Sequence, residues 1–91
     1  MTATTELAEP NGPAPAQHRK MHALWKVAGV TDRGDRLALT GQIVGRELAT
    51  SNDLDSRDAN AVIEYLVQLD EAGVLASKAA GWLAEHRRAA A

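Results

Sequence analysis

The chain has 91 residues, no cysteine and a formal net charge of −2. This length excludes a second domain and leaves roughly 70 residues for a core beyond a leading segment that looks unable to fold. The lack of cysteine excludes disulfides, thiolate metal sites and thiol nucleophiles, and it leads us to expect a cytoplasmic protein. The slightly acidic balance argues against a non-specific polyanion binder, because such proteins carry a strongly basic face.

The leading segment, residues 1–15, contains all three prolines and few large apolar side chains. This composition is typical of segments that cannot bury enough apolar surface to fold. We therefore expect a disordered N-terminal tail over 1–15 and a small helical domain over 16–91. The segment lacks the features of a secretion signal, and no apolar run approaches the about 18 residues of a membrane span, so we expect no membrane association.

A first helix is predicted over 16–27, with Pro15 at its first turn and Gly29 just past its end. Apolar residues at three- and four-residue spacing give this helix one face that should point into a core. The residues of that face are Met21, Leu24, Trp25 and Ala28.

A second helix is predicted over 32–44, with Asp32 near its start and Gly45 as its stop. Its predicted inward stripe consists of Leu37, Thr40, Gly41 and Val44, with Leu39 and Ile43 beside it, so we expect burial on two sides. Gly41 costs roughly 1 kcal/mol relative to alanine inside a helix. Its presence there suggests close packing against a neighbouring helix.

Residues 46–55 have no helical period and concentrate Ser, Asn and Asp, as turns do. We expect a structured loop whose ends are held by Leu48 and Leu54. A third helix is predicted over 56–71, with Asp55 as N-cap and Asp58 reaching back to complete a capping box. Its apolar face is predicted as Ala59, Val62, Ile63, Leu66 and Leu69.

A fourth helix is predicted from Ser77, as its cap, to about Ala90. Its only large apolar residues are Trp82 and Leu83, so it should dock weakly, and the core should end near Leu75. Trp82 either closes the end of the bundle or serves as an exposed anchor for a partner. The predicted fold class is all-α: a compact three- to four-helix bundle behind a disordered N-terminal tail.

The sequence contains no recognisable catalytic centre. No sequence context activates Ser51, Ser56 or Ser77 as a nucleophile. His18 and His22 are four residues apart, as helical metal ligands can be, but no third ligand is evident. We therefore expect no catalysis, no metal and no cofactor.

Three arginines and the loop are the main candidates for binding another molecule. Arg33, Arg36 and Arg46 could present guanidinium groups along one edge, or they could pair locally with nearby carboxylates. The predicted partner-binding set is Arg33, Arg36, Arg46, Ser51, Asn52, Asp53, Leu54 and Trp82. The candidates for nucleic-acid contact are Arg19, Lys20, Lys26, Arg87 and Arg88.

The predicted third helix is unsuited to reading a DNA duplex. The arrangement of the second and third helices invites comparison with winged helix-turn-helix proteins, whose recognition helix is basic or polar. Here that helix carries Asp58, Glu64 and Asp70, and Arg57 is its only cation. Direct recognition of the major groove is therefore disfavoured.

Just over half of the chain, residues 18–69, resembles a small helical module of actinobacteria and their phages. Its most specific pieces are AGVTDR at 28–33, VGR at 44–46 and SNDLD at 51–55. The stretch is similar to a C-terminal segment of phage recombination and nuclease proteins and, more loosely, to GemA-like phage regulators. It departs from the pattern at Asn52, where lysine is expected, and at Asp55, where threonine is expected. The missing lysine weakens the case for a phosphate contact in the loop.

The resemblance implies an accessory role in phage or host DNA transactions, with no catalytic residue to carry over. We therefore expect a non-catalytic protein-interaction module, accessory or regulatory in DNA recombination or replication, whose partner is another protein. One alternative is weak nucleic-acid binding, and another is inhibition of a host enzyme by an acidic helix that imitates nucleic acid. A second copy of the chain is also a candidate partner, because so small a domain buries a limited surface on its own.

Overall fold

The computed structural model describes residues 13–90, which form four α-helices and one turn of 3₁₀ helix. The elements are α2 (Pro15–Ala28), α3 (Arg33–Val44), η1 (Ser51–Asp53), α4 (Ser56–Glu71) and α5 (Leu75–Ala90). No strand occurs within 13–90, so the predicted all-α bundle is confirmed. Of the tail predicted over 1–15, residues 1–12 lie outside the described part, whereas Pro13 is buried and Pro15 begins α2.

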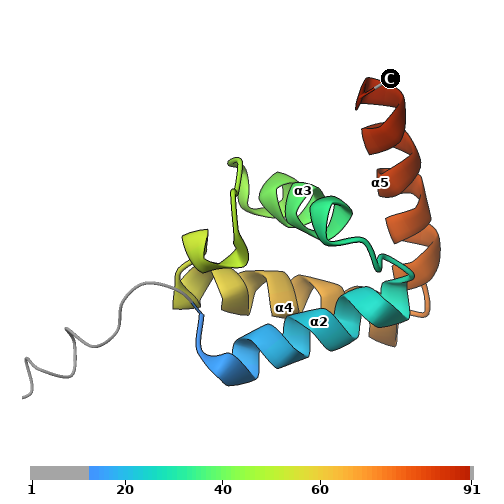
Figure 1. Ribbon diagram of the computed structural model, residues 1–91. Coiled ribbons are helices and arrows are strands. Elements are labelled where there is room, and N and C mark those ends of the chain that lie inside the picture. The colour runs from blue at the N-terminus through green and yellow to red at the C-terminus, as the bar shows by residue number, and fades with distance from the viewer. Residues whose placement is uncertain (1–12, 91) are drawn as a thin grey trace, which may run out of the picture.

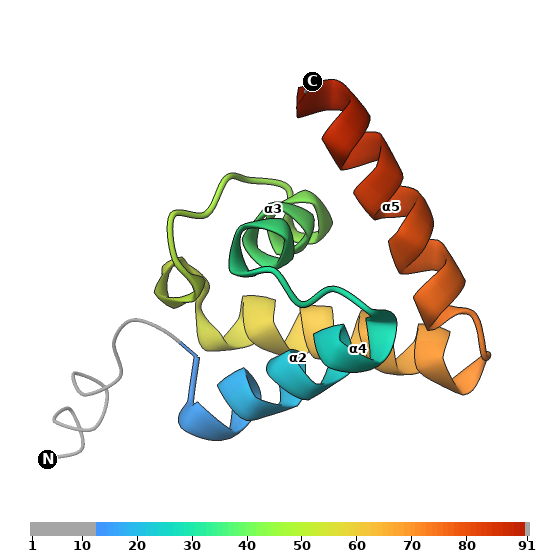
Figure 2. The ribbon, with the colours of Figure 1, turned by 45° about the vertical axis from the view of Figure 1, so that its right-hand side comes forward.

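The helices are arranged around α4. Helices α2 and α4 run side by side, α3 crosses above them, and α5 rises from the end of α4 and passes the end of α3 (Figures 1 and 2). Ala59, Val62 and Leu66 of α4 have no exposed surface, and Leu54, just before α4, is also buried. The remaining core residues are Met21, Leu24, Trp25, Ala28, Val30, Leu39, Leu75 and Ala79.

The helix ends follow local chemistry, as predicted. Asp32 caps α3 by accepting a hydrogen bond from the backbone N–H of Asp35 at 3.0 Å. Asp55 caps α4 by accepting one from the N–H of Asp58 at 2.7 Å, and the Asp58 carboxylate reaches back to the N–H of Asp55. Gly29 and Gly45 end α2 and α3 with φ values of 86° and 84°, a conformation that glycine adopts without steric cost.

The predicted inward stripe of α3 is wrong at its ends. Leu39, Thr40 and Gly41 are buried, whereas Leu37 and Val44 are only partly buried. Leu39, expected beside the stripe, is only 1% exposed. The reason is that α3 packs against both α4 and α5, which centres its buried face on Leu39 and leaves Leu37 at the rim of a cavity described below.

The prediction for the start of α5 is also wrong. The helix begins at Leu75 rather than after Ser77, and the Ser77 hydroxyl donates to the carbonyl of Val74 within the first turn. Helix α5 contacts α2, α3 and α4, and Leu75 and Ala79 in its first half are buried. From residue 84 to 90 it is exposed apart from the half-buried His86, so the expected weak docking applies to its second half. Trp82 is partly buried, meets Trp25 edge-on at a centroid distance of 6.4 Å, and stacks on Tyr65 at 6.0 Å. Aromatic pairs of this geometry contribute about 0.5–1.5 kcal/mol beyond their buried area.

Gly41 is required by the turn that follows α3, not by a neighbouring helix as predicted. The carbonyl of Gly41 accepts hydrogen bonds from the backbone N–H groups of Gly45 and Arg46, at 2.8 and 3.0 Å. This turn brings the Arg46 carbonyl oxygen to within 2.6 Å of the position that a Cβ on residue 41 would take. Any side chain at position 41 would therefore displace backbone.

We expect Gly41→Ala to destabilise the protein by about 1–3 kcal/mol, because the displaced backbone outweighs the better helix propensity of alanine. The matched control is Gly81→Ala in α5, where a Cβ meets nothing within 4 Å. That substitution should stabilise the protein by about 0.5–1 kcal/mol. Urea unfolding followed by far-ultraviolet circular dichroism measures both, and a Gly41→Ala protein as stable as the original would contradict the argument.

Candidate partner-binding site

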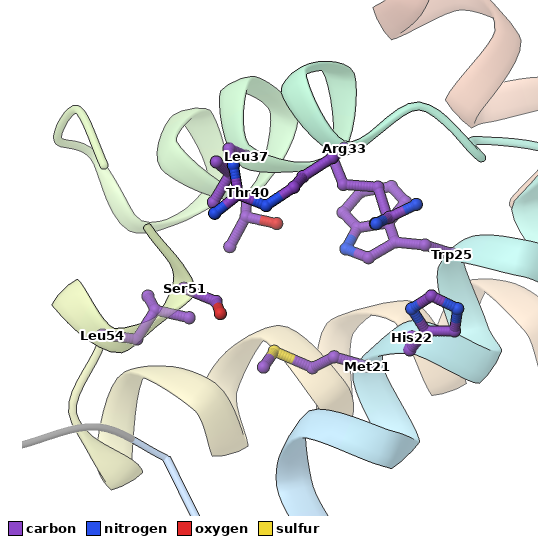
Figure 3. A pocket seen from close by; sticks show the side chains of 9 residues that line it. Met21, His22, Trp25, Arg33, Leu37, Thr40, Ser51 and Leu54 are labelled. Carbon is purple, nitrogen blue, oxygen red and sulfur yellow. The ribbon is translucent and has the colours of Figure 1, made fainter. Parts of the chain in front are cut away.

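A cavity opens between α2, α3 and the loop that precedes α4, and we call it the α2–α3 pocket (Figure 3). Its volume is about 120 Å³. Nine residues from these three segments line it: Met21, His22, Trp25, Arg33, Arg36, Leu37, Thr40, Ser51 and Leu54. The pocket therefore exists only in the folded chain, because its lining comes from segments separated in the sequence.

The floor of the pocket is apolar with a hydroxyl set into it. Met21 and Trp25, one turn apart on α2, face Leu37 of α3 and Leu54 of the loop across the cavity (Figure 3). Thr40 is 5% exposed and is the buried polar residue of this lining.

Two guanidinium groups stand at the rim. Arg33 forms no ion pair or hydrogen bond with another residue in the described range, and Arg36 donates only to the backbone carbonyl of Thr31, at 2.6 Å. The nearby carboxylates have other partners: Asp32 caps α3, and Asp35 accepts from Arg87 Nη2 at 3.0 Å. For Arg33 and Arg36, the alternative of local pairing with Asp32 or Asp35 is not formed. Arg46 does pair with a carboxylate, Asp58 rather than Glu47.

The third predicted arginine, Arg46, does not line this pocket. Its Nη2 donates to Asp58 Oδ2 at 2.7 Å and to the backbone carbonyl of Asp53 at 3.0 Å. The hydrogen bond and charge of Asp58 raise the pKa of Arg46, and the same hydrogen bond lowers the pKa of Asp58. Arg46 therefore ties the loop to the start of α4, and the predicted edge of three arginines is reduced to Arg33 and Arg36.

The loop contributes two side chains to the pocket and uses the others to hold its own shape. Ser51 and Leu54 line the cavity. Asp53 Oδ2 accepts hydrogen bonds from the backbone N–H groups of Ala49 and Thr50, at 2.7 and 3.2 Å, which lower the pKa of Asp53. Asn52 is exposed, and its N–H donates to Thr50 Oγ1 at 2.8 Å.

The predicted nucleic-acid contacts do not share one face. Lys26 adjoins His22 and Arg36 in a shallow hollow beside the pocket, whereas Arg19 and Lys20 are exposed near the start of α2. Arg87 and Arg88 lie in the last turn of α5, where Arg87 pairs with Asp35 in the first turn of α3. Trp82 packs against Trp25 and Tyr65 and does not line the α2–α3 pocket.

Five lining residues were not predicted as part of a site: Met21, His22, Trp25, Leu37 and Thr40. Trp25 lies four residues after Met21 and three after His22 on α2. This spacing places the three side chains near one another on the helix surface, and it could have indicated that they share a site. Leu37 and Thr40 carried no such signal, because the same periodicity that places a residue in a core also places it at the edge of a cavity.

Comparisons of the chain with protein-family models, with curated proteins and with solved structures give no match. Within residues 13–90, His, Asp and Glu side chains form no group of three or more that could hold a metal ion. None of the helices in this range has both the length and the apolar character needed to cross a membrane.

Replacing Arg46 by methionine should raise the pKa of Asp58 toward its ordinary value, because the hydrogen bond from Arg46 is the largest cause of its lowering. The pKa of Asp53 should change less, because backbone N–H groups dominate there. Carboxyl-detected NMR titration of both proteins measures the two values. An Asp58 pKa that does not respond to Arg46→Met would contradict the pairing.

The same shifts predict acid sensitivity. Both carboxylates have a lower pKa in the folded chain than in the unfolded one, so they stabilise the fold above the unfolded value, near 3.8. This contribution is lost as the pH falls through the folded pKa values. Stability measured by urea unfolding should therefore fall less steeply below pH 4 in Arg46→Met than in the original protein.

Proposed function

We propose that the chain is a non-catalytic protein-interaction module that binds its partner through the α2–α3 pocket. The observation that carries this proposal is the convergence of Arg33 and Arg36, both without a carboxylate partner in residues 13–90, on an apolar floor. Arginine and tryptophan are the side chains most enriched among residues that dominate protein interfaces, and here both line one small cavity.

The size of the pocket favours a protein partner over a metabolite. Sites for small molecules and cofactors typically measure about 300–1,000 Å³. At about 120 Å³, the α2–α3 pocket accommodates one side chain of a partner, with the rest of the contact on the surrounding surface. This is the usual form of an interface anchor, a single side chain inserted into a preformed notch.

The charges at the rim favour an acidic partner. No carboxylate lines the α2–α3 pocket, so no negative charge among its lining residues balances the two guanidinium groups. Guanidinium binds carboxylate or phosphate through two parallel hydrogen bonds, which gives both direction and strength to the contact. A partner segment with one apolar side chain next to an acidic group matches floor and rim together.

The biological setting that we propose is accessory or regulatory work in DNA recombination or replication, of the kind found in phages of actinobacteria. It is supported by the resemblance of residues 18–69 to a module of such proteins, and it places the chain in the cytoplasm. Three residues of the sequence pieces that carry this resemblance line the pocket: Arg33, Ser51 and Leu54. The part of the chain that carries the resemblance is thus also the part that forms the site.

The two alternative functions receive less support from the geometry. The basic candidates are divided between α2 and the last turn of α5, and Arg87 is already paired with Asp35, so fewer free charges are available to a nucleic-acid backbone. On the acidic helix, Asp55 caps α4 and Asp58 is neutralised by Arg46, which leaves Glu64, Asp70 and Glu71 as exposed charges. We therefore advance the protein-binding function alone.

Charge reversal at the rim should abolish capture of the partner. We expect Arg33→Glu/Arg36→Glu to lose at least about tenfold in partner recovery, equivalent to about 1.4 kcal/mol, because two attractive contacts become repulsive. Affinity capture from nuclease-treated actinobacterial lysate, quantified by mass spectrometry, measures the effect. Nuclease treatment removes proteins that are bridged by nucleic acid.

The matched control is Arg19→Glu/Lys20→Glu, which makes the same charge change on exposed residues of α2 outside the pocket. It should retain the partner. If both double variants lose it equally, net charge and not the pocket governs the binding, and the proposal fails. Loss only on substitution of Glu64 and Asp70 would instead favour the acidic mimic.

A further inference from the structure

The chain enters its described part beside the α2–α3 pocket. Gln17 Nε2 donates to the backbone carbonyl of Ser56 at 3.1 Å, and the Ser56 hydroxyl donates to Gln17 Oε1 at 3.3 Å. These bonds join the start of α2 to the start of α4, two residues after Leu54, which lines the pocket. In both views the start of α4 follows directly on η1 (Figures 1 and 2).

The residues before Pro13 include a segment that matches the pocket in charge. Leu7 stands between Glu6 and Glu9, and residues 1–12 contain no lysine or arginine. The pocket offers the complementary set, an apolar floor with Arg33 and Arg36 at its rim and no acidic lining residue. Leu7 is therefore an aliphatic side chain flanked by carboxylates, the chemistry that the proposed function assigns to a partner.

The connection is long enough for this segment to reach the pocket. Leu7 precedes Pro13 by six residues, which span up to about 20 Å when extended. Met21, on the pocket floor, lies six residues along α2 from Pro15, a distance of about 9 Å at the helical rise. A short tether also creates an effective concentration of about millimolar, so a contact too weak to form between separate molecules is populated within one.

We propose that the segment Glu6 to Glu9 occupies the α2–α3 pocket of its own chain, with Leu7 against the floor and its two glutamates facing Arg33 and Arg36. The inference rests on the proposed function, because it assigns the segment to the same site as the partner. The segment then competes with the partner, and a partner must bind tightly enough to displace it.

The test uses the whole chain, because the absence of cysteine allows one nitroxide label to be attached at an Ala3→Cys substitution. The label should broaden the backbone amide signals of Thr40 and Ser51 in NMR spectra, while that of Gly73, past the far end of α4, remains sharp. Leu7→Ala in the same labelled chain should restore the broadened signals. Neither substitution touches the described core, so loss of folding does not confuse the result.

A charge exchange tests the polar half of the contact. Glu6→Arg/Glu9→Arg alone should remove the broadening, and combining it with Arg33→Glu/Arg36→Glu should bring it back. Amides that stay sharp in the original labelled chain, or that remain broadened after Leu7→Ala, overturn the inference. So does broadening that appears only when labelled and isotope-enriched copies are mixed, because the contact then forms between molecules.

The outcome is separable from that of the proposed function. Capture of a partner that depends on Arg33 and Arg36, without broadening by the label, leaves the proposed function standing and removes this inference. If both hold, Leu7→Ala should increase partner recovery, since the competing segment is lost.

Discussion

The apolar face of α4 is the surface on which the rest of the molecule is assembled. Ala59, Val62 and Leu66 have no exposed surface because α2, α3 and α5 each cover part of the helix. Burial of this kind contributes about 25 cal/mol per Å² of apolar surface. Helix α2 runs beside α4, and α3 crosses above both (Figure 1). The α2–α3 pocket is lined by residues of α2 and α3 together with Ser51 and Leu54 of the loop before α4.

Around this core, the carboxylates are distributed so that two arginines are left for outside contact. Asp32 serves as a helix cap and Asp35 pairs with Arg87, while Asp53 and Asp58 hold the loop and Arg46. Each of these contacts stabilises a local feature of the fold. Together these contacts leave Arg33 and Arg36, at the pocket rim, without a carboxylate partner among residues 13–90. The pocket therefore favours an acidic occupant.

Sequence reasoning succeeded where structure depends on neighbours within one or two turns. The caps Asp32, Asp55 and Asp58 and the stops Gly29 and Gly45 act on backbone groups a few residues away, so their spacing is sufficient to identify them. It failed at the start of α5: Ser77 was predicted as the cap, whereas the helix begins two residues earlier, at Leu75. It also underestimated the first half of α5, because the aromatic partners of Trp82 come from α2 and α4 and leave no trace in the sequence of α5 itself.

The sequence by itself determined the number, order and approximate bounds of the helices, because periodicity and capping are encoded by adjacent residues. It also identified Arg33, Arg36, Ser51 and Leu54 as candidates. Only the tertiary structure decided that these four line one pocket, that His22 and Thr40 belong to it, and that Arg46 does not. The physical reason is that a site built from three segments depends on how helices cross and which ion pairs form, and neither is set by local spacing.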